Sequence, residues 1–186
     1  MSLQHPLFPI SLQTHWYDPI ASELDPELLN WLLDSTSLTA RLKSHCVNFR
    51  VELLGQQVES CSVNEATHDI IAGEPVLVRE VALYCDEIPQ VFARSLLPLS
   101  SLTGEEQHLA NLGTKSLGQV IFSNPMLVRK KIHIASFEAH SSVGQFAEYL
   151  NLTVSQPLWG RRSTFMLDSK PLIVAEVFLP QAFAYQ

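Results

Sequence analysis

No apolar run in the 186-residue chain approaches the roughly 18 residues that a membrane-spanning helix needs. The N-terminal stretch, MSLQHPLFPI, lacks a basic region followed by an apolar core, so we expect no signal peptide and a cytoplasmic location. Basic residues are also few, since 12 Lys and Arg against 19 Asp and Glu give a net charge of −7. This balance argues against a general affinity for nucleic acids or anionic membranes.

Cysteine is equally scarce. Cys46, Cys61 and Cys85 form no CxxC pair, which gives no indication of a zinc or redox motif and favours reduced, structural thiols. The seven histidines show no concentrated spacing that would suggest a metal site. GxSxG, GxGxxG and P-loop sequences are all absent, so neither a serine nucleophile nor a nucleotide site is indicated.

What the sequence does contain is the composition of a globular protein. Hydrophobic residues make up 46% and charged residues 17% of the chain, which is not the balance of a disordered segment. The length suits one domain with a sizeable core, and we expect residues 1–186 to form it.

Alternation of polar and apolar residues predicts five or six strands. The first ends near Gly55, residues 56–74 stay unassigned, and DEIP joins the next two strands as an antiparallel hairpin. A second hairpin is predicted around residues 168–170. The predicted strands cover residues 46–53, 75–85, 89–98, 126–137, 161–167 and 171–179.

Helices are predicted between the strands rather than in regular alternation with them. Asp25 is a candidate N-cap before Pro26, and Ser35 or Ser37 can cap a second short helix. A further helix is predicted from Thr103 to a stop at Gly113, followed by a short helix or turn, and residues 141–152 also have a helical pattern. The predicted fold class is therefore α+β, an antiparallel sheet with helix pairs at 26–43 and 103–122 as lids over one face.

Three strands each carry one charge within an apolar stripe: Arg79, Arg94 and Glu176. One interpretation is structural, with Glu176 in a buried salt bridge to Arg79 or Arg94, or with one face solvated. The other is a pocket for a small acidic, hydroxylated ligand, because the planar fork of arginine can hold a carboxylate through two hydrogen bonds. A helix-turn-helix role for the helix pairs is disfavoured by their few basic residues.

Five segments occur in an order and with a character that resemble the chorismate lyase family of bacterial ubiquinone biosynthesis. They are VLVREVAL, FARSLLP, LGTKSLGQVIF, WGRRSTF and KPLIVAEVFLP. LDPELLNWLLDSTSLTARL is similar to that family's N-terminal helical region, so the resemblance covers about residues 24–180.

The resemblance implies a chorismate pyruvate-lyase, which cleaves chorismate into 4-hydroxybenzoate and pyruvate in the first committed step of ubiquinone biosynthesis. It implies no metal or organic cofactor, and a monomer whose partners are the small-molecule substrate and products. It also implies a single antiparallel sheet of about six strands, with two helix-turn-helix flaps over a buried ligand site.

Ligand contacts of the family fall on Arg79, Leu117 and Glu176 of this chain, and a fourth falls on Leu38, where the best-known form has methionine. The resemblance implies that Arg79 and the Leu117 N–H hold a carboxylate, while Glu176 orients the 4-hydroxyl. Three roles fit Arg94: contact with the pyruvyl carboxylate, the lining of the ligand's exit, or a structural ion pair. Arg161 and Arg162 alternate faces, so at most one of them points at the site.

The chain departs from the family pattern in several places. Residues 1–23 are an N-terminal extension, and residues near 136–157 read as an insertion that forms an extra surface helix. Gln90 stands where a tryptophan is often found, which would alter packing near Arg94. Substitution of Glu176 would stabilise the protein if its charge is buried without a close partner.

Two other functions stay open on the sequence. Effector-sensing domains of some bacterial transcription regulators resemble the chorismate lyase fold and bind small ligands without catalysis. A related lyase would make 3-hydroxybenzoate from the same substrate. The residues favour the 4-hydroxy product only through the family resemblance.

Overall fold

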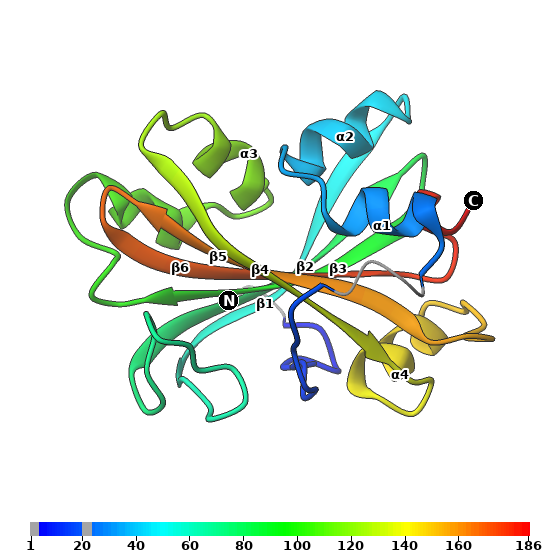
Figure 1. Ribbon diagram of the computed structural model, residues 1–186, viewed down its shortest axis with the longest axis horizontal. Helices are drawn as coiled ribbons and strands as arrows, with labels where there is room; N and C mark the ends of the chain where they lie inside the picture. The colour runs from blue at the N-terminus through cyan, green and yellow to red at the C-terminus, as the bar shows by residue number, and fades with distance from the viewer. Residues whose placement is uncertain (1–3, 20–23) are drawn as a thin grey trace.

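An open sheet of six antiparallel strands organises the protein in a computed structural model that describes residues 4–19 and 24–186. The strands are β1 (Phe49–Ser60), β2 (Pro75–Cys85), β3 (Ile88–Pro98), β4 (Leu127–Phe137), β5 (Leu158–Leu167) and β6 (Lys170–Phe178). Their order is β1-β2-β3-β6-β5-β4, so two units of three sequential strands meet where β3 pairs with β6 (Figure 1). The predicted α+β class is confirmed.

The helices cover the two faces of the sheet unequally. They are α1 (Pro26–Leu32), α2 (Leu38–Ser44), η1 (Gly104–Asn111), α3 (Leu117–Phe122), α4 (Ser142–Tyr149) and η2 (Phe183–Tyr185), where η marks a 3-10 helix. In Figure 1 the sheet is seen close to edge-on, with α1, α2 and α3 above it and α4 below. The two predicted helix pairs therefore lie on one face, and we call α1–α2 and η1–α3 the two flaps.

Helix starts follow the capping rules. The Asp25 carboxylate accepts hydrogen bonds from the N–H groups of Glu27 and Leu28, and the Ser37 hydroxyl accepts one from Ala40. The helix predicted at residues 103–113 is wrong in type, since it is a 3-10 helix and the Thr103 side chain makes no capping bond. Short 3-10 helices are common as connectors, and this one buries little apolar surface against the sheet.

Two-residue turns close both predicted hairpins. Asp86 and Glu87 join β2 to β3, and Asp168 and Ser169 join β5 to β6; all four have positive φ between 48° and 65°. Turns of this kind match the twist of antiparallel strands and fix which residues face each other across the hairpin.

The prediction that the first strand ends near Gly55 is wrong, because β1 continues through a bulge to Ser60. Gly55 is instead a place of close approach. A Cβ added there would collide with the ring of Phe8, so only glycine lets the N-terminal segment pack on this strand.

The face opposite the flaps is covered by the N-terminal segment and α4. The predicted extension at residues 1–23 is described at positions 4–19, and residues 1–3 and 20–23 lie outside the described residues. Its buried side chains share one core with those of α4; they are Ile10, Leu12, Trp16, Val143, Phe146 and Ala147. The predicted helix within residues 136–157 is thus present, but its apolar face belongs to the core. That the stretch is an insertion stays a prediction.

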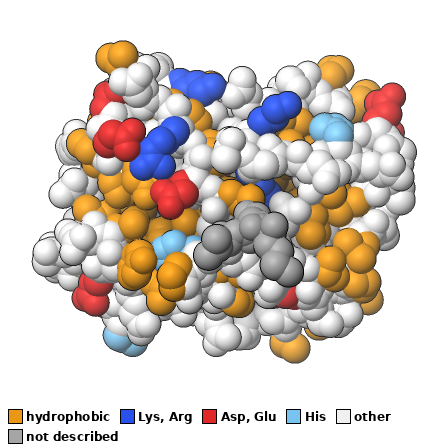
Figure 2. Space-filling model, turned by 180° about the vertical axis from the view of Figure 1, so that it is seen from behind, with side chains coloured by type: hydrophobic (Ala, Val, Ile, Leu, Met, Phe, Trp, Pro, Cys, Tyr) orange, Lys and Arg blue, Asp and Glu red, His pale blue; other side chains and the backbone are white. Residues whose placement is uncertain are grey.

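The surface shows no large single-sign area on the face drawn in Figure 2, where basic side chains lie close to acidic ones. Within residues 4–19 and 24–186, no helix has the length and apolar character needed to span a bilayer.

Candidate active site

The face of the sheet beneath the flaps brings together four of the residues predicted from the sequence. Arg79 on β2 and Glu176 on β6 line a cavity together with Leu38 and Leu117, the first residues of α2 and α3. Each of the two flaps therefore supplies the start of one helix, and the sheet supplies the charges.

The cavity is small and closed, with a volume of about 30 Å³. One water needs about 10–15 Å³ of such space, so the described closed form has room for very few waters. Its walls are mainly apolar and include Val81, Leu83, Ala93, Ile121, Phe122, Phe165 and Val174. An aromatic acid would have to displace the flaps to enter.

Arg79 is a buried cation without a carboxylate partner among the described residues. Its Nη2 donates to the carbonyl oxygens of Gly113 and Lys115 over 2.9 and 2.8 Å, while its Nε has no hydrogen-bond partner. Burial lowers the pKa of the guanidinium to about 10, so it keeps its charge near neutral pH. A buried, charged and incompletely bonded arginine is suited to an anionic ligand.

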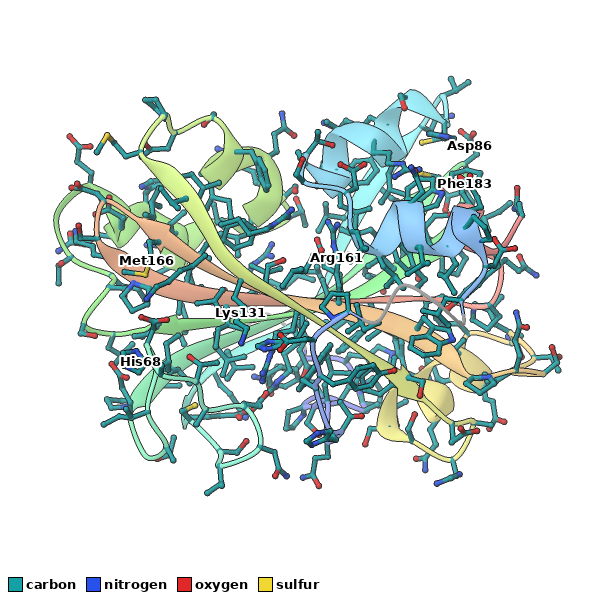
Figure 3. All side chains as sticks on the ribbon, viewed as in Figure 1. His68, Asp86, Lys131, Arg161, Met166 and Phe183 are labelled. Carbon is teal, nitrogen blue, oxygen red and sulfur yellow. The ribbon has the colours of Figure 1, made fainter. Side chains whose placement is uncertain are left out.

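Glu176 has a charged partner, and it is neither of those considered from the sequence. Nε of Arg161 donates to Oε2 of Glu176 over 2.7 Å, so the alternative of a salt bridge to Arg79 or Arg94 is wrong in its partner. The Glu176 side chain is 14% exposed, whereas that of Arg161 is 1% exposed. Figure 3 shows Arg161 on the flap side of the sheet. The condition under which loss of Glu176 would stabilise the protein, the lack of a close partner, is not met.

Arg94 lies on the opposite face of the sheet, away from Arg79. It forms ion pairs with Glu80 at 2.8 Å, Glu65 at 2.6 Å and Glu59 at 3.3 Å. Burial alone would lower its pKa, but the bonds to Glu65 and Glu80 outweigh this effect and raise it. Of the three roles considered for Arg94, the geometry matches the structural ion pair.

A β-bulge explains why Arg79 and Arg94 separate. Opposite Leu83 and Tyr84, the partner residues are Val91 and Pro89, so Gln90 is the extra residue in β3. One extra residue reverses the face on which every later side chain points. Gln90 itself is buried, and its Oε1 accepts a hydrogen bond from the N–H of Phe183, so it holds the C-terminal turn rather than the surroundings of Arg94.

The neighbouring arginines of β5 point to opposite faces, as predicted. Arg161 faces Glu176, whereas Arg162 lies over the ring of Trp16 at 5.2 Å on the other face. Nη1 of Arg161 also donates to carbonyl oxygens of the first flap, at 2.9 Å for Asp34. The same guanidinium therefore contacts the site carboxylate and the flap above it.

Three further residues that line the cavity were not predicted from the sequence: Arg129, Thr39 and Ser116. Nη1 of Arg129 donates to the Asp34 carbonyl oxygen over 2.8 Å, and its guanidinium lies 4.9 Å from the Phe165 ring centre. In the sequence, Arg129 is followed by two lysines, and three consecutive basic residues are typical of a solvent-exposed segment. The bulge that turns Lys130 outward and Arg129 toward the cavity cannot be recognised from the sequence.

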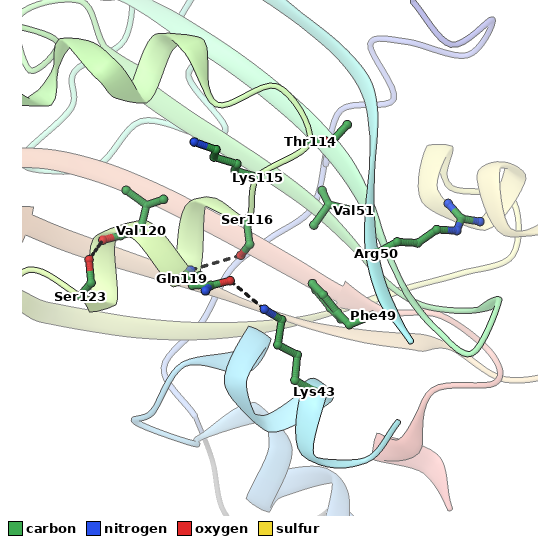
Figure 4. Close-up of a pocket in the computed structure, with 10 residues that line it drawn as sticks. All are labelled: Lys43, Phe49, Arg50, Val51, Thr114, Lys115, Ser116, Gln119, Val120 and Ser123. Atoms are coloured by element: carbon green, nitrogen blue, oxygen red, sulfur yellow. Dashed lines mark hydrogen bonds between the residues drawn. The ribbon is translucent and has the colours of Figure 1, made fainter. Parts of the chain in front are cut away.

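The two flaps touch through polar side chains. The hydroxyls of Thr39 and Ser116 share a buried hydrogen bond of 2.6 Å, and Lys43 Nζ donates to Gln119 Oε1 over 2.8 Å at the surface. Outside this contact lies an open pocket of about 700 Å³, to which Lys43, Gln119 and Phe49 contribute (Figure 4). Ser116 therefore lines both the small cavity and this larger outer hollow.

The fold of this protein is similar to that of bacterial regulators whose structures have been solved. The C-terminal domain of the histidine utilization repressor from Pseudomonas syringae pv. tomato matches with a TM-score of 0.56 and 13% identity, over 72% of this chain and 92% of that chain. At this identity the likeness concerns the fold alone.

Sequence comparisons go further. The family model described as chorismate lyase matches residues 12–186. A probable chorismate pyruvate-lyase of Psychromonas ingrahamii is 42% identical over 95% of this chain and 96% of the relative. Another, of Shewanella amazonensis, is 40% identical over 100% of this chain and 97% of the relative. The protein belongs to the chorismate lyase family.

Proposed function

We propose that the protein is a chorismate pyruvate-lyase that converts chorismate into 4-hydroxybenzoate and pyruvate, the step that commits chorismate to ubiquinone biosynthesis. The observation that carries the proposal is the closed, mainly apolar cavity in which Arg79 and Glu176 face a space between two flaps. It rests also on membership of the family.

Arg79 binds the ring carboxylate in this proposal. Its Nε is buried and unpartnered, and its charge is not compensated by a carboxylate. The backbone N–H groups of Leu38 and Leu117 lie in the first turns of α2 and α3, where N–H groups have no partner within the helix. They are further donors for the same carboxylate.

Glu176 orients the 4-hydroxyl of the substrate. Arg161 engages Oε2, and Oε1 makes no hydrogen bond with any described residue, so it can accept one from the ligand. Glu176 is the sole carboxylate lining the cavity, and the described lining contains no His, Lys, Cys or Tyr. A second acid–base group is therefore lacking in the described lining.

This composition favours catalysis by positioning. The C4 hydrogen passes to the methylene carbon of the enolpyruvyl group, the ether C3–O bond breaks, and the ether oxygen becomes the keto oxygen of pyruvate. All atoms of chorismate are then accounted for by 4-hydroxybenzoate and pyruvate, and the ring becomes aromatic. Holding the reactive conformer supplies most of the acceleration in such a step.

One assay tests the function and the route together. Purified protein is incubated with chorismate deuterated at C4, and the products are identified by chromatography and mass spectrometry. We expect 4-hydroxybenzoate and pyruvate, with deuterium in the pyruvate methyl group. Base-assisted elimination would instead lose the label to water, and 3-hydroxybenzoate would identify the related lyase.

A non-catalytic ligand-binding domain is the competing function, because the structural neighbour named above is part of a repressor. Binding of 4-hydroxybenzoate by folded protein without any turnover of chorismate would favour it. We also propose that residues 1–186 act as one domain, as a monomer and in the cytoplasm; light scattering of the purified protein tests the oligomeric state.

A further inference from the structure

The charges around the cavity do not cancel. Arg161 and Glu176 form one neutral pair at 2.7 Å. Arg79 and Arg129 also line the cavity, and neither has a carboxylate within ion-pair distance among the described residues. Two positive charges are left without counter-charges, at a site where an unpaired charge is costly to bury.

Arg129 reaches the cavity because of a bulge in β4. Arg129 faces Phe165 and Lys131 faces Thr164, so Lys130 is the extra residue. The bulge places Arg129 on the flap side with Phe165, whereas Lys130 points to solvent and pairs with Asp69 at 2.6 Å. Bulges beside active sites commonly redirect a side chain in this way.

The Arg129 guanidinium is held but not saturated. Nη1 donates to the Asp34 carbonyl oxygen over 2.8 Å, and the rings of Phe165 and Phe122 lie 4.9 and 5.6 Å away. Its Nε is buried and has no hydrogen-bond partner. Burial, and next the charge of Arg161, lower the pKa of Arg129, although the charges of Glu176 and Asp34 oppose them.

The strand order sets the two free cations on opposite sides of Glu176. Arg79 is on β2, Glu176 on β6 and Arg129 on β4, and the sheet runs β2-β3-β6-β5-β4 between them. A ligand that meets both arginines must therefore carry anionic groups at two separate points. Chorismate does, since its ring carboxylate is on C1 and its second carboxylate belongs to the enolpyruvyl group on the C3 oxygen, beside the 4-hydroxyl.

We propose that Arg129 binds the enolpyruvyl carboxylate of the substrate, which makes the site selective for a dianion. The inference rests on the proposed function, because that function supplies the identity of the ligand. Arg161 is less suited to this role, since its charge is already paired with Glu176 and it is not among the described residues that line the cavity. The monoanion 4-hydroxybenzoate leaves Arg129 without a counter-charge, so Arg129 favours substrate over product.

The test compares a dianion with a monoanion. The probes are 3-(carboxymethoxy)-4-hydroxybenzoate, an unreactive aromatic dianion, and 4-hydroxybenzoate, each titrated calorimetrically into wild type and Arg129→Met. We expect the variant to weaken the dianion by about 10- to 100-fold, the effect of losing one charged hydrogen-bonding partner, and the monoanion by less than about threefold. KM for chorismate should rise with the dianion's Kd.

Equal weakening of both probes would overturn the inference, because it would show that Arg129 only supports the flap through Asp34. Unchanged binding of the dianion would overturn it as well. Arg129→Gln keeps a donor for the Asp34 carbonyl oxygen and serves if the methionine variant does not fold. Lys130→Met, which alters the neighbouring exposed charge, is the matched control and should change neither Kd.

Wild-type protein provides a readout that needs no variant. It should bind the dianion more tightly than the monoanion, and the reverse order would contradict the role of Arg129. Failure of wild type to turn over chorismate would instead contradict the proposed function and leave this charge comparison interpretable.

Discussion

Arg161 and Glu176 face each other across β5 and β6, joined by a hydrogen bond of 2.7 Å from Nε to Oε2. The same guanidinium donates to backbone carbonyl oxygens of the first flap, including that of Asp34. The carboxylate of the site and the flap above it therefore depend on one side chain.

Arg161→Met should destabilise the protein and reduce activity together. A buried pair broken on one side typically costs about 3–5 kcal/mol, and the Arg161 side chain is 1% exposed. Chemical denaturation measures the free energy of unfolding, and the double variant Arg161→Met with Glu176→Gln should recover part of the loss. If the double variant is as unstable as the sum of the singles, the pair is not coupled.

Glu176→Gln should lower kcat/KM by about 10- to 100-fold, the worth of a charged hydrogen bond of about 1.5–3 kcal/mol. Because Arg161 then faces an uncharged amide, the variant should also be less stable than wild type. Steady-state kinetics and thermal unfolding measure the two effects. A variant of near wild-type kcat/KM would show that Glu176 does not contact the substrate.

Arg79→Met should reduce kcat/KM by at least about 10- to 100-fold while changing stability little. The side chain is buried without a carboxylate partner, and residues kept for function often contribute little to stability. Circular dichroism with chorismate kinetics separates the two quantities. Full activity in a folded variant would remove Arg79 from the site.

Arg94→Met should have the opposite effect, reducing the stability of the protein while leaving its activity unchanged. Its loss leaves Glu80 and Glu65 with uncompensated buried charge, at a cost of about 3–5 kcal/mol. Turnover per folded molecule, measured well below the unfolding temperature, should equal that of wild type. A selective loss of kcat/KM would contradict the placement of Arg94 on the structural face.

The alternation of polar and apolar residues was sufficient to predict both hairpins and all strands except the extent of β1, because burial repeats every two residues in a half-covered strand. It did not predict which face of the sheet the flaps cover. Arg79 and Glu176 were predicted as charges within apolar strands, and Leu117 was predicted only through the family resemblance. Their common location needs the pairing of distant strands, which local patterns do not contain.

Which arginine of β5 faces Glu176 depends on the length of the turn between β5 and β6. With Asp168 and Ser169 as the whole turn, Leu167 faces Lys170 and Arg161 faces Glu176; a three-residue turn would have put Arg162 there. The bulges at Gln90 and Lys130 have the same effect on Arg94 and Arg129. A bulge or turn of one extra residue decides on which face of the sheet a charged side chain lies, and the sequence pattern does not reveal such residues.

Thr39→Val should loosen the closed state of the flaps. It removes the 2.6 Å hydrogen bond to Ser116 without removing the cap that Ser116 gives to α3. If the closed state loses about 1 kcal/mol of stability with this hydrogen bond, 4-hydroxybenzoate should be released about fivefold faster. Stopped-flow fluorescence measures the release rate. Lys43→Met, which removes the exposed bridge to Gln119, is the control and should have a smaller effect.

His133 should make stability depend on pH. Burial, and next Arg162 and Lys131, lower its pKa below 6.5, although Asp18 opposes them. Between the folded pKa of His133 and 6.5, the unfolded chain therefore binds more protons than the folded protein. The contribution of neutral His133 to the free energy of unfolding is complete above pH 6.5 and is lost as the pH falls through this range. Unfolding free energies of His133→Gln should fall less steeply with acid than those of wild type.

The junction of β3 and β6 implies a mechanical role for the proposed substrate. Arg79 belongs to the unit formed by β1, β2 and β3, whereas Glu176 and Arg129 belong to the unit formed by β4, β5 and β6. A substrate bound as proposed would connect these two halves of the sheet, which come from different parts of the chain. Binding should therefore slow the separation of these halves, so that the protein resists unfolding most while substrate is bound.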